Sequence, residues 1–334
     1  MSKKIFITGA TGYLGQRFAV GLAENGHSVN ALVRNLSQAR LLLNHPQIRL
    51  FEGCILKKET ISPAMRGCTE VYHFAALASV WDKDPAAFER INVEGLKNIL
   101  DCCVAIGLKD LLFTSTAGVV GSSRDLQPVA ELTNQNPELE TLYEKSKLHA
   151  EILLKTYLDK GIRAVIVNPS RVYGPGLLTE SNGFTRLMNM YLQGRWKIKP
   201  GEGKSIGNYV FIDDVMEGFL LAMEKARPGE RYLLGGVDVS YSDFFNTIDK
   251  ISGKHHKLYS VPLTLMILLS YIQLGLANTF GRHPMITPAF VRKYNRNWLV
   301  CSDKAKDELG YKITPLETGL SKTLQWLGNQ EKLT

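Results

Sequence analysis

Short runs of apolar, often β-branched residues alternate with longer stretches of helical periodicity from residue 3 to about 169. This alternation is typical of βαβ units and predicts a parallel sheet with helices on its faces. The expected strands are 3–8, 28–33, 48–52, 70–74, 110–116 and 163–168. The expected helices are 12–25, 58–65, 85–105 and 141–159, and Gly26, Gly67, Gly107 and Gly161 stand near their ends, where glycine commonly stops a helix.

The pattern loosens after Pro169, where Gly and Pro interrupt the chain at 174–176, 200–203 and 228–229. We therefore expect an α/β, Rossmann-type doubly wound lobe over 1–173 and a smaller substrate-binding lobe over most of 174–334. A later strand near 230–235 is expected to return to the first lobe. Since no repeat or long linker is evident, the two lobes should share a tight cleft.

Composition narrows the class of protein. The 334 residues carry a net charge of +8, but Lys and Arg are scattered among 32 acidic residues, so a nucleic-acid partner is not expected. The five cysteines are odd in number and none forms a CxxC pair, which predicts no metal site and a reducing, cytoplasmic location. The first strand begins close to Met1 without a signal-like apolar stretch, so export is not expected.

The segment 262–280 is rich in Leu, Ile and Met. A membrane span needs ~20 predominantly apolar residues, whereas this segment is short and contains Ser270, Gln273 and Asn278. We favour a buried or pocket-lining helix. Peripheral membrane contact through a surface-embedded helix is the alternative.

A glycine-rich turn follows the first expected strand, in the order Thr8-Gly9-Ala10-Thr11-Gly12-Tyr13-Leu14-Gly15. Glycines there let the backbone turn sharply and approach a pyrophosphate, while the helix that follows presents free N–H groups and partial positive charge. A glycine-rich turn without a ligand is the alternative. The strand before and the helix after it favour a dinucleotide site formed by Gly9, Thr11, Gly12, Tyr13, Leu14 and Gly15.

Arg34 follows directly after the second expected strand, where the acidic residue that would bind the ribose 2′-hydroxyl of NAD is lacking. The planar guanidinium of Arg34 instead matches the 2′-phosphate of NADP. We therefore predict NADP(H) as the cofactor, with NAD(H) and a merely solvated arginine as alternatives. Ala75 and Ala76, after the fourth strand, leave room for the adenosine half.

The candidate chemistry lies at the end of the fifth strand and on the fourth helix. Ser115 and Thr116 place hydroxyls at the carboxyl edge of the sheet, where ligands of open α/β folds bind. Tyr143 and Lys147 stand four positions apart and so share one helix face. A phenol with an ordinary pKa near ~10 is a poor base at neutral pH. Positive charge from Lys147 and an oxidised nicotinamide is expected to lower that pKa, so that Tyr143 shuttles a proton.

These motifs together resemble the extended short-chain dehydrogenase/reductases of the NAD-dependent epimerase/dehydratase superfamily, over nearly the whole chain. Within that superfamily the chain is most similar to the branch of dihydroflavonol reductases, 3β-hydroxysteroid dehydrogenases and farnesol dehydrogenases. The segments that carry this similarity are 80–82, 92–95, 168–170, 173–176 and 303–311.

The resemblance implies a role for each matching residue. Tyr143 is the catalytic acid/base, Lys147 holds the nicotinamide ribose, and Thr116, or else Ser115, orients the substrate oxygen. Pro169, Ser170 and Val172 are expected along the nicotinamide, and Arg34 near the adenosine phosphate.

Two departures from the family pattern limit this transfer. Many relatives have Gly-Asp after the third strand, whereas this chain has Gly53-Cys54-Ile55, so the adenine contacts stay open. Ala117-Gly118 follow Thr116 in place of the acidic pair typical of the dehydratases. Elimination of water is therefore not expected.

The sequence predicts an oxidoreductase that transfers hydride between NADPH and a carbonyl, in either direction, on an apolar small molecule such as a terpenoid, steroid, flavonoid or acyl ketone. The apolar stretches 184–192 and 263–276 suggest the apolar substrate. A nucleotide-sugar epimerase with tightly bound NAD is an alternative, with Arg186, Arg195, Arg282 and Arg292 as candidate diphosphate ligands. A non-catalytic NADPH-binding sensor is a second alternative, and both a monomer and a homodimer remain open.

Overall fold

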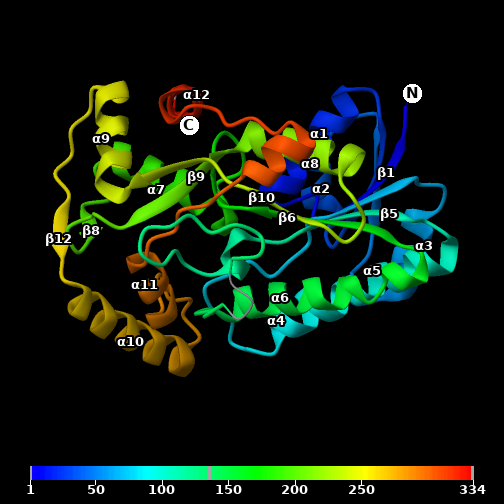
Figure 1. The fold of residues 1–334 in the computed structure, drawn as a ribbon, viewed down its shortest axis with the longest axis horizontal. Coiled ribbons are helices and arrows are strands. Elements are labelled where there is room, and N and C mark those ends of the chain that lie inside the picture. The colour runs from blue at the N-terminus through cyan, green and yellow to red at the C-terminus, as the bar shows by residue number, and fades with distance from the viewer. Residues whose placement is uncertain (1, 134–136, 332–334) are drawn as a thin grey trace.

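In the computed structural model of the protein, residues 2–133 and 137–331 are described. Seven parallel strands form the central sheet in the order β10-β6-β5-β4-β1-β2-β3 (Figure 1). They are β1 (Lys4–Thr8), β2 (Ser28–Val33), β3 (Ile48–Glu52), β4 (Glu70–His73), β5 (Asp110–Thr114), β6 (Arg163–Pro169) and β10 (Arg231–Leu234). The strand order reverses between β1 and β4, and ligands of such sheets bind outside the carboxyl ends of the strands at this point.

Helices cover both faces of this sheet, as the two apolar faces of a buried parallel sheet require. One face carries α1 (Tyr13–Glu24) and α8 (Ile212–Lys225), and the other carries α3 (Lys58–Met65), α5 (Gly95–Ile106) and α6 (Leu142–Lys155) (Figure 1). Phe18 and Phe219 fill the first core, whereas Leu96, Phe113 and Leu154 fill the second. The predicted doubly wound, Rossmann-type fold is confirmed.

Some elements differ in detail from the expectation. The predicted helix 85–105 is present as one continuous helical segment, formed by α4 (Ala87–Glu89), a π-helical turn η1 (Arg90–Glu94) and α5, and the buried Asn92 of the π turn bonds outside the helix. The helix expected over 141–159 ends at Lys155 and is followed by a separate turn, η3 (Leu158–Lys160), and β5 stops at Thr114 because a turn, η2 (Ala117–Val120), begins soon after it. A further short helix, α2 (Leu36–Leu42), was not predicted.

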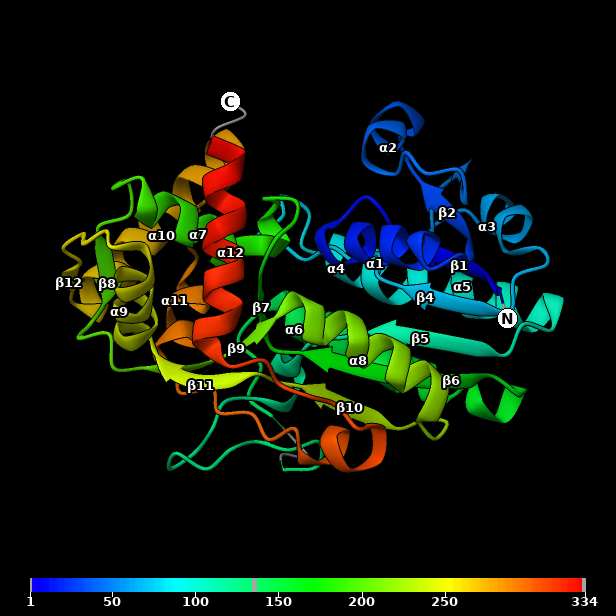
Figure 2. The same cartoon turned by 90° about the horizontal axis from the view of Figure 1, so that it is seen from above.

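The substrate lobe lies beside the carboxyl edge of the sheet (Figure 2). Its strands are β7 (Arg171–Tyr173), β9 (Ile206–Phe211) and β11 (Val237–Ser240) in one small sheet, and β8 (Ile198–Pro200) with β12 (Tyr259–Val261) in another. Its helices are η4 (Glu180–Asn182), α7 (Gly183–Leu192), α9 (Tyr241–Ser252), α10 (Leu263–Phe280), α11 (Pro288–Asn295) and α12 (Leu316–Glu331). The later segments α8, β10 and a π-helical turn, η5 (Ala305–Leu309), instead pack with the large sheet.

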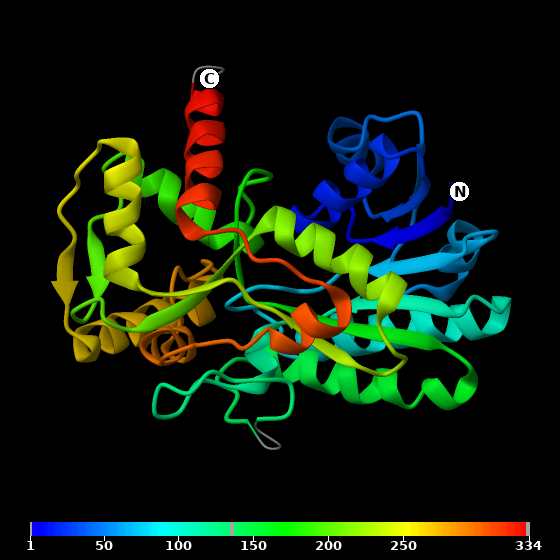
Figure 3. The same ribbon diagram turned by 45° about the horizontal axis from the view of Figure 1, so that its top comes forward.

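Tyrosine and phenylalanine side chains join the two lobes. Tyr13 of the glycine-rich turn lies in one core with Tyr173, Phe244 and Leu320 of the substrate lobe. Leu320 belongs to α12, which stands where the two lobes meet (Figure 3). This shared core fixes the position of the substrate lobe relative to the carboxyl edge of the sheet.

Helix α10 is not buried, contrary to one half of the favoured prediction, although its Met266 borders a large cavity, as a pocket-lining helix would. Its 18 residues have a mean hydropathy of 1.5, enough by length and composition to cross a membrane, yet only 17% of them are buried. Ser270 and Ala277 face the protein, whereas large apolar side chains are exposed, among them Leu265, Leu268, Leu269, Tyr271, Ile272, Leu276 and Phe280. Figure 1 shows α10 at the outer edge of the substrate lobe, beside α11. Its apolar character therefore does not come from a place in the core.

Candidate active site

The backbone of the glycine-rich turn is packed so closely at Gly9 and Gly15 that a side chain would not fit at either position. Gly9 has φ +73°, and a Cβ there would lie 2.6 Å from the Ala75 nitrogen. A Cβ on Gly15 would lie 2.3 Å from the Gly9 carbonyl oxygen. These contacts are with backbone atoms, so the turn has no room to adjust. The glycines hold the β1–α1 backbone against the segment after β4.

The N-terminus of α1 opens at this turn. Its N-cap is Gly12, which supplies no side-chain hydrogen bond to the first N–H groups of the helix. Tyr13 is buried, and its hydroxyl donates to the Gly174 carbonyl oxygen at 3.1 Å. We therefore expect Tyr13 to contact a dinucleotide through its backbone, while its ring joins the two lobes. The turn fits a pyrophosphate, because free N–H groups and the helix dipole both favour an anion.

The adenosine end of the cavity lies at the carboxyl ends of β2 and β3. Arg34 is exposed, borders the cavity, and has no ion-pair partner in the described parts of the chain. Gln38, Cys54 and Ile55 border the cavity beside it. A free guanidinium at this position fits a phosphate group on the adenosine ribose.

A capping box starts the catalytic helix α6 at a defined residue. The Thr141 side chain accepts from the Glu144 N–H, and the Glu144 carboxylate accepts from the Thr141 N–H at 3.1 Å. Tyr143 and Lys147 follow on one face of the helix, and both border the cavity. The Lys147 ammonium is 1% exposed and lies 4.0 Å from the centre of the Phe113 ring on β5.

Burial sets the proton affinities of this pair. It lowers the pKa of Lys147 to about 7, against a smaller opposing effect of Glu151. Burial also raises the pKa of Tyr143 above its ordinary value, and the Glu144 carboxylate raises it further. Both effects favour the protonated phenol, and the expectation that Lys147 and an oxidised nicotinamide together lower the pKa of Tyr143 stays a prediction for the cofactor-bound protein. The phenol is held protonated, which is the form that donates a proton.

Hydroxyl groups surround the space in front of Tyr143. The Thr116 oxygen accepts from the Gly118 N–H at 3.2 Å, which leaves its own hydrogen free to donate. The hydroxyls of Ser115 and Ser170 are buried and have no hydrogen-bond partner among the described residues. An unpaired buried hydroxyl costs free energy, so these two sites fit polar groups supplied by a cofactor or substrate.

Two asparagines connect the segments that carry the catalytic side chains through side-chain hydrogen bonds. Asn92 accepts from the Leu77 N–H at 2.7 Å and donates to the Ser146 hydroxyl at 2.8 Å, which ties the loop after β4 to α6. Asn168 donates to the Thr116 carbonyl at 3.0 Å and to Glu151 at 2.8 Å. Both lie in segments that carry the family resemblance, but sequence reasoning gave neither a role.

One cavity of about 1040 Å³ brings the candidate residues together. Every residue that the sequence predicted for catalysis or cofactor binding borders it: Gly9, Thr11, Gly12, Tyr13, Leu14, Gly15, Arg34, Ala75, Ala76, Ser115, Thr116, Tyr143, Lys147, Pro169, Ser170 and Val172. The substrate lobe adds mainly apolar and aromatic side chains, including Phe184, Leu187, Met190, Met266, Ile286 and Phe290. Of the four arginines considered for a diphosphate, Arg186 borders this cavity, whereas Arg292 pairs with Glu140.

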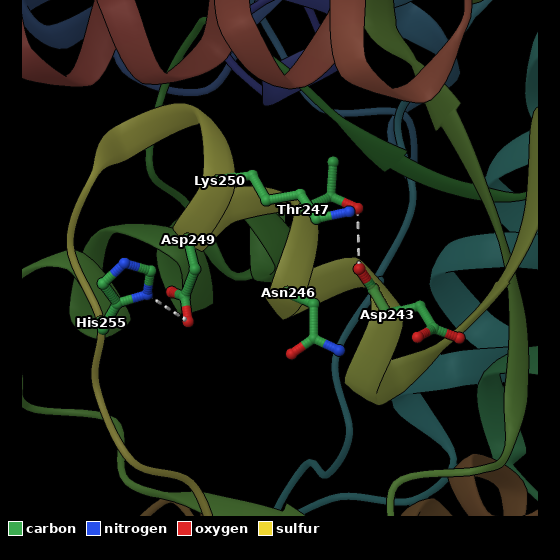
Figure 4. A pocket seen from close by; sticks show the side chains of 6 residues that line it. All are labelled: Asp243, Asn246, Thr247, Asp249, Lys250 and His255. Atoms are coloured by element: carbon green, nitrogen blue, oxygen red, sulfur yellow. Dashed lines mark hydrogen bonds and ion pairs between the residues drawn. The ribbon is translucent and has the colours of Figure 1, made fainter.

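A second hollow of about 540 Å³ lies along α9, and its lining is polar (Figure 4). His255 pairs with Asp249 across it at 3.4 Å, and the Thr247 hydroxyl donates to the Asp243 carbonyl oxygen at 2.8 Å. None of the residues predicted for catalysis or cofactor binding borders this hollow. The chemistry therefore belongs to the large cavity.

The fold and the large cavity define a nucleotide-dependent oxidoreductase, with a dinucleotide turn at one end and a tyrosine–lysine pair at the other. The chain belongs to the NAD dependent epimerase/dehydratase family, which matches residues 5–235. It is an NAD(P)-dependent oxidoreductase of the extended short-chain dehydrogenase/reductase type, as the sequence predicted.

Similar proteins agree with this assignment. A putative dihydroflavonol 4-reductase of Synechocystis is 30% identical, with 98% of this chain and 96% of that protein covered. A mouse sterol-4-alpha-carboxylate 3-dehydrogenase is 24% identical, with 97% and 91% covered. The UDP-glucose 4-epimerase of Thermotoga maritima has the same fold, with a TM-score of 0.81 at 24% identity and coverage of 99% and 100%.

Proposed function

We propose that the protein is an NADPH-dependent reductase of a carbonyl group on a largely apolar small molecule, such as a sterol, terpenoid, flavonoid or acyl ketone. The observation that carries this proposal is the cavity itself, where Tyr143, Thr116 and Lys147 share one space with an apolar and aromatic wall. Relatives named for a dihydroflavonol and a sterol carboxylate support an apolar substrate. Arg34 supports NADP(H) over NAD(H).

The proposed reaction adds a hydride to the carbonyl carbon and a proton to its oxygen. The nicotinamide cofactor supplies the hydride when it is bound. Thr116 donates a hydrogen bond to the carbonyl oxygen and polarises it, and Tyr143 gives that oxygen its proton. The positive charge of Lys147 then stabilises the phenolate that remains. The reverse direction oxidises an alcohol with the same groups.

The test is NADPH oxidation by the purified protein with ketones of graded polarity. We expect turnover to rise with the apolar character of the ketone, and Tyr143→Phe to lower kcat/KM by about 10²–10⁴-fold because the proton donor is lost. Tyr157→Phe, at a tyrosine that does not border the cavity, is the control. Equal turnover by Tyr143→Phe would remove the assignment, and NAD retained through purification with epimerisation of a sugar nucleotide would favour the epimerase.

We also propose that the enzyme is cytoplasmic and contacts a membrane surface through α10. The helix has no charged residue, and its exposed apolar side chains continue into Met285, which is 69% exposed. Exposed cationic residues flank it at Lys254, Lys257 and Arg282, and the chain as a whole is cationic, which favours an anionic lipid surface over a second copy of this chain. Met266 of the same helix borders the substrate cavity, so an apolar substrate has a short path from lipid.

Flotation with phosphatidylcholine vesicles, with and without phosphatidylglycerol, tests this contact. We expect binding to the anionic vesicles, and loss of it in the double variant Leu268→Gln/Ile272→Gln with NADPH binding unchanged. Leu41→Gln, at an exposed leucine on α2, is the matched control. No binding by the wild type, or a dimer that the double variant dissociates, would overturn the membrane proposal.

A further inference from the structure

Arg171 is a cation in the substrate part of the cavity that the reduction step does not use. It lies on β7, between two residues expected at the nicotinamide, Ser170 and Val172, and it borders the same cavity as Tyr143. Its guanidinium carbon lies 4.5 Å from the centre of the Tyr294 ring, 5.5 Å from that of Tyr209 and 5.7 Å from that of Phe184. Aromatic rings of the substrate lobe therefore hold its position.

The described residues place no anion against this guanidinium. Arg171 has no ion-pair partner within the described ranges, and its Nη2 is buried without a hydrogen-bond acceptor. Its one printed hydrogen bond, from Nη1 to the Tyr209 hydroxyl, is long at 3.4 Å. The arginine as a whole is half-buried, and leaving its buried Nη2 donor unsatisfied costs free energy unless an anion completes the site.

The neighbouring strand leaves space for this side chain. A Cβ on Gly207 of β9 would lie 2.1 Å from the Arg171 Nη1. Any other residue at 207 would displace the guanidinium from its place among the rings. Glycine at 207 and arginine at 171 together form a fixed cationic subsite.

We propose that Arg171 binds an acidic group of the substrate, a carboxylate, while the carbonyl lies at Tyr143. This inference rests on the proposed reductase function and narrows its substrate to a keto acid with an apolar body. A guanidinium binds a carboxylate with paired N–H donors, and the aromatic rings keep water from competing. Arg171 is thus a specificity residue that binds the substrate and takes no part in proton transfer.

The experiment compares a long-chain keto acid with its methyl ester as substrates for NADPH oxidation. A charge-assisted hydrogen bond contributes ~1.5–3 kcal/mol, so we expect the acid to be preferred about 10- to 100-fold in kcat/KM. Arg171→Met should abolish this preference by raising KM for the acid while turnover of the ester stays the same. Arg171→Lys should restore part of the preference for the acid. Arg186→Met, at an exposed arginine on the same cavity, is the control and should leave that preference unchanged.

A second readout does not need turnover. A saturated fatty acid should inhibit ester reduction competitively in the wild type and much more weakly in Arg171→Met, whereas its methyl ester should show no such difference. Equal use of acid and ester by the wild type, or equal loss of both in Arg171→Met, would overturn the proposal. Stronger inhibition by an alkyl phosphate than by the fatty acid would assign the subsite to phosphate instead. A failure of the proposed reductase function would give a different result, because Tyr143→Phe would then turn over the ester as fast as the wild type.

Discussion

Replacing Lys147 by Met should stabilise the protein while it removes activity. Burial lowers the pKa of Lys147 from its ordinary 10.5 to about 7. Below pH 7 the amine is protonated in both the folded and unfolded states, so the folded state bears the whole cost of the buried charge. At ~1.4 kcal/mol per pKa unit this cost is about 5 kcal/mol at pH 6. At pH 9 the folded lysine is neutral, and the cost falls to ~2 kcal/mol.

The stability advantage of Lys147→Met over wild type, measured as the increase in the free energy of unfolding, should therefore be about 3 kcal/mol larger at pH 6 than at pH 9. Urea unfolding of the protein without cofactor, at both pH values, measures this difference. Lys145→Met, at an exposed lysine on the same helix, should show no such pH dependence. A Lys147→Met variant that is no more stable than wild type at pH 6, or whose advantage does not shrink at pH 9, refutes the argument that burial sets this pKa.

Two further substitutions test the dinucleotide end of the cavity. Gly15→Ala places a Cβ 2.3 Å from the Gly9 carbonyl oxygen, so we expect a loss of ~1–3 kcal/mol in stability with weaker NADPH binding; Gly21→Ala, in open space on the same helix, is the control, and thermal melting with cofactor fluorescence measures both. Arg34→Ser should raise KM for NADPH by about 10- to 100-fold and leave KM for NADH unchanged, because only NADPH carries a 2′-phosphate on its adenosine ribose. An equal change in both KM values would contradict an NADP site.

The sheet was predictable because most of its strands are buried on both faces. Strands β2 and β3 have the predicted bounds: β2 is an almost continuous buried run, whereas β3 lies at the sheet edge with Arg49 and Glu52 exposed. Helix α2 was missed because only Ala39 in it is buried, so it has no apolar periodicity to read. Its start depends on Asn35, whose side chain accepts from the Gln38 N–H at 2.9 Å.

The elements that sequence patterns misplaced are those whose surroundings lie far away in the chain. The side chain of Asn92 in the π turn bonds to Leu77 and to Ser146, 54 residues away, and a local sequence pattern does not reveal these contacts. Apolar composition predicted burial for α10, but composition alone does not say which apolar surroundings a helix has. The sequence pattern also did not reveal Arg171 as a binding residue, because its aromatic neighbours come from three separate elements, α7, β9 and α11.

The Glu144–Lys293 pair connects the catalytic helix to the substrate lobe. The Glu144 carboxylate is 1% exposed beside Tyr143, and its Oε1 lies 2.7 Å from the Lys293 Nζ on α11. Gly118 makes room for it, since a Cβ there would lie 2.7 Å from the same oxygen. Without Lys293 the carboxylate would be a buried, uncompensated charge next to the phenol, which is strongly destabilising. The position of α11 therefore bears on the proton affinity of Tyr143, because α11 supplies the charge that compensates Glu144.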